Sequence, residues 1–483
     1  MKKFLIINII FATLLVGCDD WLDVNTDPNN PTSVGPDLVL PVAQHYTARI
    51  MQEDRGVNHL GNMMMYNWSE SAGFSWYNDE FLYLSTSTFY DQIFDHTYYD
   101  ALKQYSDLDG LGDDYAAYKA ISMIMKAYHF QLLVDFYGDI PYFEALGRSL
   151  NATPAYDGAS AVYDDLLVQL TEAIAMIDAA DALTTSIYPA DDDVIFGGDM
   201  AAWKTFANSI KLRILTRVSD VKDAASITSE LDAIAAEGSG YITSAVMVNP
   251  GYANQENQQS PLWYSFGQSV AGSATLSGDA TCATDYMIQY LTDSNDPRID
   301  VLYEEPTSGH LGVPQGITSD PNTQGPTMVS NIGPGVLIGP DQGAVVMTTA
   351  EVYFNLAELA DKGFAVGDAG TLYTQGVTAS FTQLGLTGAD ASAYLAQGGN
   401  LIAYSDLEDI ITQKWIATNG LTAEQSWFDW SRTGFPSNLP VSQEEANLVR
   451  PVRLAYPASE VGGNANNLPT QPDPFTAKVF WAN

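Results

Sequence analysis

The stretches TTAEVYFNLAELADKGF (348–364) and DAGTLYTQGVTASFTQL (368–384) decide the fold class. Apolar residues recur in both at three- and four-residue spacing, which predicts helices over 350–362 and 368–384, the first ended by Gly363. In tetratricopeptide repeats, two helices cross closely where large residues of one helix pack against small residues of the other. The spacing of large and small residues in these two stretches matches that pattern. These residues are Tyr353, Leu356 and Ala357, followed by Ala369, Tyr373 and Gly376. The pair predicts a scaffold of helix pairs.

Three stretches upstream have the same helical spacing and extend this scaffold: 113–137, 159–179 and 200–218. Four of the 20 basic residues of the chain lie on the last of them, and we expect them to offset a neighbouring acidic face. They are Lys204, Lys211, Arg213 and Arg217.

Two tracts interrupt the helical pattern. Residues 238–345 and 435–475 are rich in Gly, Pro, Asn, Ser and Thr, and helical periodicity is weak in the first outside 283–291. Loops this long in a compact protein are usually either functional or disordered, and binding residues favour such loops. We therefore predict a mostly α fold over 36–483, in which tetratricopeptide-like helix pairs form a scaffold for a large, loop-rich ligand-binding subdomain.

The N-terminus has the layout of a secretory signal. Two lysines precede a short apolar run that ends at Gly17, and Cys18 follows directly. The run is shorter than the roughly 20 apolar residues that a membrane-spanning helix needs. Residues 1–17 are therefore predicted to be a signal peptide, Cys18 a lipidated new N-terminus, and 18–35 a tether. An ordinary signal peptide with an incidental cysteine is the alternative.

The composition excludes some partners. The chain has 59 acidic and 20 basic residues, so its formal net charge is −39. A field of this sign repels the phosphates of nucleic acids and anionic lipid head groups. Nucleic acid is therefore not an expected partner, whereas neutral or cationic ligands are.

The densest aromatic run outside the predicted helices is MYNWSESAGFSWYNDEF (65–81). Sugars are bound by aromatic planes that cover an apolar face and by amides or carboxylates at the hydroxyl rim. The run supplies both kinds of group. Its candidate ligand-binding residues are Trp68, Trp76, Tyr77, Asn78 and Asp79. The alternative is that these rings pack beneath a loop.

A second candidate lies at the head of the first irregular tract, in QSPLWYSFG (259–267). Its rings are Trp263 and Tyr264, and the preceding segment offers Asn254, Asn257 and Gln258 as hydrogen-bonding groups. Trp427 and Trp430, by contrast, share one helical face, and we interpret them as framework residues.

Catalytic and metal-binding motifs are missing from the sequence. There is no GxSxG, HExxH or phosphate-binding loop, so we expect no catalytic residue and no enzyme activity, with a surface glycoside hydrolase as the rival class. Asp191–Asp193 and the acids of 293–300 could attract calcium, but 293–304 lacks the glycine of an EF-hand loop. The histidines show no zinc-ligand spacing. We therefore predict no resident metal or other cofactor.

Several segments, in this order, resemble SusD/RagB-type outer-membrane lipoproteins of Bacteroidota, and in detail the second SusD-like group. They are GCDDWLDVNTDPNNPT (17–32), AYDGASAVYDDLLVQLTEAI (155–174), GGDMAAWKTFANSIKLRILTRVS (197–219), DSNDPRIDVLYE (293–304), TTAEVYFNLAELADKGF (348–364), ITQKWIATNGLTAEQSWFDWSRTGFP (411–436), RLAYPASEVGGNANN (453–467) and FTAKVFWAN (475–483). The Trp-rich segment departs from the family pattern at Ser431, where an arginine is usual.

The resemblance implies a fold of four tetratricopeptide helix pairs beneath a variable, loop-rich ligand face. It implies a lipid-anchored protein on the outer membrane that faces the cell exterior. It also implies a partner, a SusC-type TonB-dependent β-barrel transporter, to which the protein hands a captured nutrient. An oligosaccharide is the expected nutrient, and a peptide is the alternative.

Overall fold

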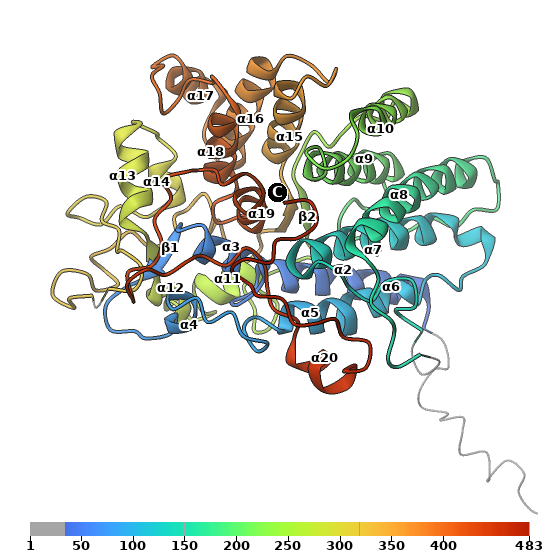
Figure 1. The fold of residues 1–483 in the computed structure, drawn as a ribbon, viewed down its shortest axis with the longest axis horizontal. Coiled ribbons are helices and arrows are strands. Elements are labelled where there is room, and N and C mark those ends of the chain that lie inside the picture. Colours follow the sequence, from blue (N-terminus) through green and yellow to red (C-terminus); the bar gives the residue numbers. More distant parts are fainter. Residues whose placement is uncertain (1–33, 148–150, 318, 483) are drawn as a thin grey trace, which may run out of the picture.

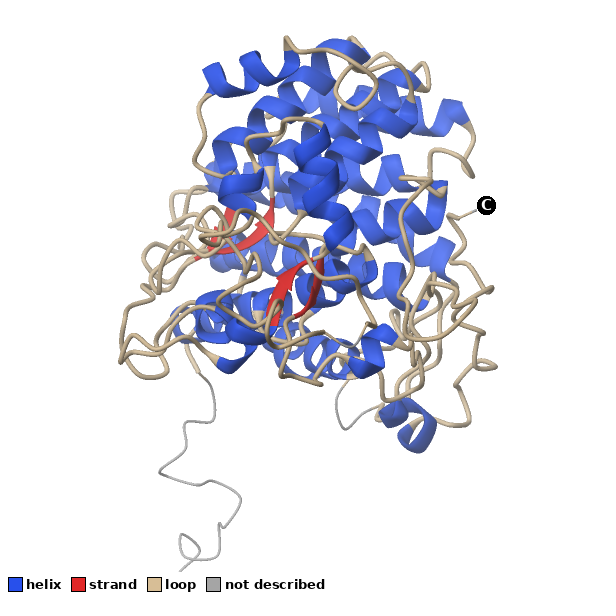
Figure 2. Ribbon diagram, turned by 90° about the vertical axis from the view of Figure 1, so that its left-hand side faces the viewer, coloured by secondary structure: helices blue, strands red, loops and turns tan. Residues whose placement is uncertain are grey.

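The computed structural model describes residues 34–147, 151–317 and 319–482 of the chain. Helices make up most of its regular structure, and two small sheets lie among them (Figures 1 and 2). The predicted signal peptide, Cys18 and nearly all of the predicted tether lie outside the described residues. Among those residues, no helix combines the length and the apolar character that crossing a bilayer requires.

The helices of the first half are α2 (Pro36–Gln52), α3 (Val57–Met64), α4 (Asn78–Phe81), α5 (Gln92–His96), the π-helix η1 (Thr97–Leu102), α6 (Lys103–Ser106), the 3₁₀ turn η2 (Asp113–Tyr115), α7 (Ala116–Tyr137), α8 (Ala159–Asp181), α9 (Met200–Arg217) and α10 (Ala224–Glu237). Those of the second half are α11 (Pro261–Phe266), α12 (Leu276–Ala280), α13 (Asp285–Asp293), α14 (Ile299–Leu302), α15 (Thr349–Asp361), α16 (Ala369–Gln383), α17 (Gly388–Leu395), α18 (Leu407–Thr418), α19 (Glu424–Thr433) and α20 (Ala458–Gly463). The long helices lie within three residues of their predicted bounds, and the largest difference is at the start of α7, where the 3₁₀ turn η2 occupies 113–115.

The helices pack as neighbouring pairs, as predicted. Helix α7 packs on α8, α8 on α9, and α15 on both α16 and α18. Side-chain caps begin the helices of the deciding pair: the Thr348 hydroxyl accepts a hydrogen bond from the backbone of α15, and the Asp368 carboxylate accepts one from α16. Gly363 follows α15 with a left-handed φ of 92°, which ends the helix where the sequence predicted.

The close crossing of α15 and α16 is present, but one predicted residue is replaced by its neighbour. A Cβ atom on Gly376 would lie 2.7 Å from the ring of Phe354, so no larger residue fits there without a shift. Phe354 is buried, whereas Tyr353 is half-buried. The ring that meets the small residue is therefore that of Phe354, one position beyond Tyr353.

The basic residues of α9 all pair with acids, which confirms the expected acidic counterface. Lys204 lies 2.9 Å from Asp178, and Lys211 lies 3.2 Å from Glu230. The two arginines reach the core, where their pairs join helices of both halves of the chain. These pairs are Arg213 with Glu351 at 2.6 Å, and Arg217 with Asp135 at 3.5 Å and Asp429 at 2.9 Å.

Asp429 is the centre of this buried network. Besides Arg217, it contacts Lys414 at 2.7 Å and Arg432 at 3.3 Å, and all four side chains are almost completely buried. Burial alone would raise the pKa of Asp429, but the surrounding cations outweigh this effect and hold the pKa below its usual value. The network therefore links α9, α18 and α19 by charge as well as by packing.

Two antiparallel sheets bring distant loops together. Strand β1 (Trp68–Glu70) pairs with β3 (Thr281–Ala283), with Ser69 opposite Cys282. Strand β2 (Val246–Val248) pairs with β4 (Ala344–Met347). The first sheet matters for function, because it places the aromatic run of 65–81 beside the segment that contains α11 and α12.

Candidate functional site

The predicted ligand-binding aromatics divide into exposed and buried rings. Trp76 is 39% exposed and Tyr264 is 55% exposed, whereas Trp68 and Tyr77 are each 1% exposed. Trp263 is half-buried, and its ring lies so close to Gly267 that a Cβ atom there would be 2.5 Å away. Asn78 and Asp79 are exposed. Of the predicted ligand-binding rings, Trp76 and Tyr264 are therefore the two that the fold presents most openly to solvent.

Trp68 and Tyr77 belong to the core, which corrects the expectation that their rings face a ligand. The ring of Trp68 contacts that of Phe266 at 5.3 Å, and His59 packs against both Trp68 and Tyr77. The Tyr77 hydroxyl forms a hydrogen bond of 2.7 Å with Thr281. A ring sealed in this way cannot stack on a sugar, so both residues leave the candidate set.

Backbone hydrogen bonds on both sides hold Trp76 in place. The carboxylate of Glu70 accepts a hydrogen bond from the backbone N–H of Trp76 at 2.6 Å and one from Tyr77 at 3.3 Å. The guanidinium of Arg55 donates to the backbone carbonyl of Trp76 at 3.2 Å. The ring of Phe74 meets that of Trp76 edge to face at 5.3 Å. These contacts fix the Trp76 loop before any ligand arrives.

Glu70 is a functional candidate that sequence reasoning missed. It ends β1, is 9% exposed, and its burial raises its pKa. The sequence around Glu70 contains no motif that predicts this role. The hydrogen bonds that Glu70 accepts from Trp76 and Tyr77 depend on the turn between these residues, which no local pattern predicts.

Tyr264 borders a hollow of about 750 Å³ formed by α11, α12 and the loops beside them. Asp54 and Glu256 carry the only charges among the described residues that line it, and both are acidic. Polar and apolar side chains alternate over the rest of the wall. The other lining residues are Asn257, Gln259, Ser265, Ser269, Val270, Ala271, Thr275, Leu276 and Ser277. Of the predicted hydrogen-bonding residues, Asn257 lines the hollow, and Asn254 holds the Gln259 side chain at 3.0 Å.

Both exposed rings are connected to one short segment, Asp54–Arg55, that follows α2. Asp54 lines the hollow of Tyr264, and Ser277 and Ser265 anchor its side chain and backbone at 2.9 Å each. Arg55, the next residue, holds the carbonyl of Trp76. Trp76 and the hollow of Tyr264 therefore share one support, and we call Trp76, Tyr264 and this hollow the aromatic face.

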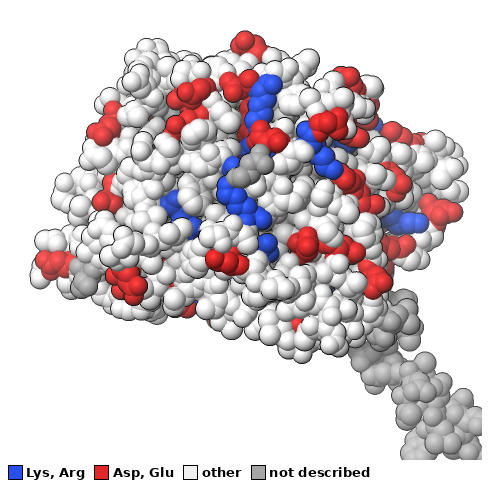
Figure 3. All heavy atoms as spheres, in the orientation of Figure 1, with Lys and Arg blue, Asp and Glu red and all other residues white. Residues whose placement is uncertain are grey.

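Asp54 is ionised at neutral pH. Burial would raise its pKa, but the contacts with His59 and the hydroxyl of Ser277 lower the pKa to about 2. The neighbours of Asp54 therefore keep its carboxylate ionised, and Asp54 contributes a negative charge to the hollow at neutral pH. Figure 3 shows on one side of the molecule that acidic residues are widely scattered, while basic residues gather in a short central band.

Asn78 and Asp79 lie beyond the hollow of Tyr264. Asn78 lines a smaller cavity of about 320 Å³, together with Glu70 and Phe74. Asp79 accompanies Asn78 in the first turn of α4. Asn78 and Tyr264 therefore line two separate depressions, which have no lining residue in common.

Trp427 and Trp430 occupy framework positions. Trp427 is buried and donates a hydrogen bond of 2.8 Å to the carbonyl of Pro451, and Trp430 lies 4.6 Å beneath the guanidinium of Arg450. Ser431, where the family pattern has an arginine, is buried as well.

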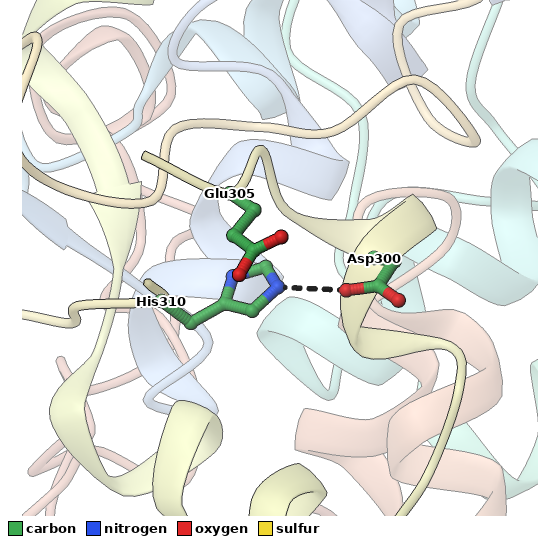
Figure 4. A group of neighbouring side chains, drawn as sticks. All are labelled: Asp300, Glu305 and His310. Atoms are coloured by element: carbon green, nitrogen blue, oxygen red, sulfur yellow. Dashed lines mark hydrogen bonds and ion pairs between the residues drawn. The ribbon is translucent and has the colours of Figure 1, made fainter. Parts of the chain in front are cut away.

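The acidic runs that could attract calcium are occupied by protein contacts. Asp193 accepts hydrogen bonds from Gln44 and Trp203, and Asp296 forms a fully buried ion pair with Arg298. Asp300 alone of these acids forms a group with potential metal ligands, together with Glu305 and His310 (Figure 4).

Known proteins of the same fold cover nearly the whole chain. A chitin-binding SusD homologue from Flavobacterium johnsoniae is 22% identical with a TM-score of 0.75, over 92% of this chain and 98% of its own. A SusD homologue from Bacteroides uniformis is 24% identical with a TM-score of 0.72, over 92% and 99%. One from Bacteroides ovatus is 21% identical with a TM-score of 0.74, over 92% and 99%. No curated protein matches the chain.

The sequence itself matches a family model over most of its length. The matched region is residues 28–457, and the model is described as "Starch-binding associating with outer membrane". The region includes the helix pairs, the buried network around Asp429 and both rings of the aromatic face. The chain therefore belongs to the SusD-like family of outer-membrane-associated proteins, in the group that this model describes.

Proposed function

We propose that the protein is a lipid-anchored surface protein that captures an oligosaccharide on the aromatic face and passes it to a SusC-type TonB-dependent transporter. The observation that carries this proposal is the exposure of Trp76 and Tyr264, both of which are connected to the segment Asp54–Arg55. Exposed aromatic rings offer flat apolar faces on which a sugar ring can stack.

The chemistry of the aromatic face suits a sugar. The rings offer flat apolar surfaces, and Asn257, Gln259 and the serines beside them offer the donors and acceptors that ring hydroxyls need. The hollow of about 750 Å³ has the size of a site for a small ligand or a few sugar units.

The charge of the hollow narrows the ligand class. Because Asp54 and Glu256 bring negative charge and no lysine or arginine is among the described lining residues, an anionic sugar would be repelled. We therefore infer a neutral or amino-bearing glycan rather than a uronic acid or a sulfated one. A peptide with a free amino group meets the same conditions and is the second candidate.

Delivery to a transporter rests on the family, and the anchor at Cys18 rests on the N-terminal sequence. The transporter partner fits the family to which the chain belongs. The anchor rests on the run that ends in Gly17 and Cys18, outside the described residues. Replacing Cys18 with alanine should release the protein from membranes, and membrane association that persists in this variant would contradict the anchor.

The test of ligand capture uses affinity electrophoresis followed by calorimetry with soluble oligosaccharides. Oligomers of N-acetylglucosamine and of glucose are the first probes, because one structural relative is described as chitin-binding and the family model as starch-binding. Polygalacturonate serves as the anionic comparison. We expect retention on a neutral glycan, none on the anionic one, and no release of reducing ends.

A matched pair of variants places the site. Tyr264→Ala should lose retention, whereas Tyr99→Ala should keep it, because Tyr99 is also exposed but does not line the hollow. Equal loss in both variants would contradict the aromatic face. Release of reducing ends would favour a hydrolase, and binding of peptides alone would favour the second candidate.

A further inference from the structure

Two carboxylates and an imidazole converge at the edge of the loop-rich tract, away from the residues of the aromatic face. Asp300 lies on α14, Glu305 follows that helix, and His310 lies on the next loop. One potential ligand atom from each lies within 4.8 Å of the other two, and Nε2 of His310 is 2.9 Å from a carboxylate oxygen of Asp300. Figure 4 shows Asp300 and Glu305 approaching the imidazole from different sides.

Backbone hydrogen bonds fix the loop that carries these side chains. The N–H of Glu304 donates to the carbonyl of Asn331 at 2.9 Å, and the N–H of Ser330 donates to the carbonyl of Leu311 at 2.8 Å. The N–H of Gly309 closes a turn on the carbonyl of Pro306 at 2.9 Å. Residues on both sides of His310 are therefore tied to the neighbouring segment 330–331, which keeps the three side chains together.

The other nitrogen of His310 has a partner that suits metal binding. Nδ1 lies 3.1 Å from the hydroxyl of Ser330, and the imidazole is 10% exposed. A hydroxyl can donate or accept, so Ser330 can hold either tautomer of the ring. With the proton on Nδ1, Nε2 is left with a free lone pair that faces Asp300, as in histidines that ligate metals.

The charge of the cluster is not balanced by the protein. In the described part of the chain, neither Asp300 nor Glu305 forms an ion pair with lysine or arginine. His96 and Asp100 form a similar pair at 2.6 Å on consecutive helical turns, but no third potential ligand joins it among the described residues. The cluster thus differs from an ordinary surface His–Asp pair by the added carboxylate of Glu305.

We propose that Asp300, Glu305 and His310 bind a divalent transition metal ion, with zinc as the expected species. One nitrogen and two carboxylate oxygens are a donor set that zinc accepts, with water completing the coordination, whereas magnesium and calcium prefer oxygen alone. The bound ion would cross-link α14 to the loop that contains His310. Its role would be to stiffen the base of the loop-rich tract.

Calorimetric titration of the metal-stripped full-length protein with zinc chloride tests the site. We expect one equivalent to bind, and Glu305→Gln and His310→Gln to weaken the dissociation constant by 10-fold or more. Glu305 has no hydrogen bond or ion pair among the described residues, so its variant should fold normally. His96→Gln is the matched control, and its zinc affinity should equal that of the unmodified protein.

Thermal denaturation gives a second measurement, which does not depend on the heat of zinc binding. When free zinc exceeds the dissociation constant of the unmodified protein 100-fold, the midpoint should rise by about 2–3 °C in that protein and by at most about half as much in Glu305→Gln. Magnesium should cause no such rise. Equal zinc affinity in Glu305→Gln and the unmodified protein, or a loss of binding in His96→Gln, would overturn the proposal.

Discussion

The helical scaffold and the aromatic face use charge and aromatic rings in opposite ways. In the scaffold, Arg217, Lys414 and Arg432 are buried around Asp429, and the rings of Trp427 and Phe428 pack beside them. On the aromatic face, Trp76 and Tyr264 are exposed, and the described charges of the hollow are all negative. The comparison shows that basic residues, scarce in this chain, are used to hold helices together rather than to attract a ligand.

The largest expected effect tests the scaffold. Arg432→Ala removes a buried cation, so the buried negative charges of Asp429 and Glu358 are no longer fully balanced. This change should lower the free energy of unfolding by about 3–5 kcal/mol. Urea denaturation measures this value. Lys222→Ala, which breaks the exposed pair with Asp164, should cost at most about 1 kcal/mol. Similar losses in both variants would remove the distinction between buried and surface pairs.

The next effect tests the close crossing of α15 and α16. Gly376→Ala drives a methyl group into the buried ring of Phe354, which should cost about 1–3 kcal/mol through overpacking. Gly388→Ala, at the start of α17, meets no atom closer than 3.9 Å and should be neutral or slightly stabilising. Thermal denaturation of the two variants separates the outcomes, and equal midpoints would contradict the crossing.

A smaller effect tests how the scaffold positions the aromatic face. Glu70→Ala removes the acceptor of two backbone hydrogen bonds, so the Trp76 loop should loosen and glycan affinity should fall about 5-fold, or about 1 kcal/mol. Glu70→Gln keeps an oxygen that can accept them and should restore most of the affinity. If Glu70→Gln binds as weakly as Glu70→Ala, or if Glu70→Ala binds normally, Glu70 does not position the ring.

The smallest effect concerns pH and Asp54. Its pKa is about 2 in the folded protein, below the ordinary 3.8, so the stability that it contributes is present above pH 3.8 and is lost as the pH falls through about 2. Because the side chain is partly exposed, we expect this contribution to stay under about 1 kcal/mol. The stability difference between the unmodified protein and Asp54→Asn should therefore shrink from pH 6 to pH 3. A constant difference would contradict the linkage.

Local patterns predicted the scaffold well. The spacing of apolar residues located α7, α8, α9, α15 and α16, and Gly363 marked the end of α15, because these features depend on neighbours within one or two helical turns. That the α9 cations pair with acids could also be anticipated, because four of the 20 basic residues lie on this one stretch of a strongly acidic chain. Their individual partners could not, because Glu351 and Asp429 lie far along the chain.

The sequence by itself determined that this is a helical, strongly acidic member of its family with two aromatic runs outside its long helices. Only the tertiary structure decided which of those rings face solvent. Trp68 and Trp76 lie in the same short run, yet Trp68 is sealed by Phe266, nearly 200 positions away, while Trp76 is held outward by Glu70 and Arg55. Burial depends on contacts between distant segments, and no local pattern encodes those contacts.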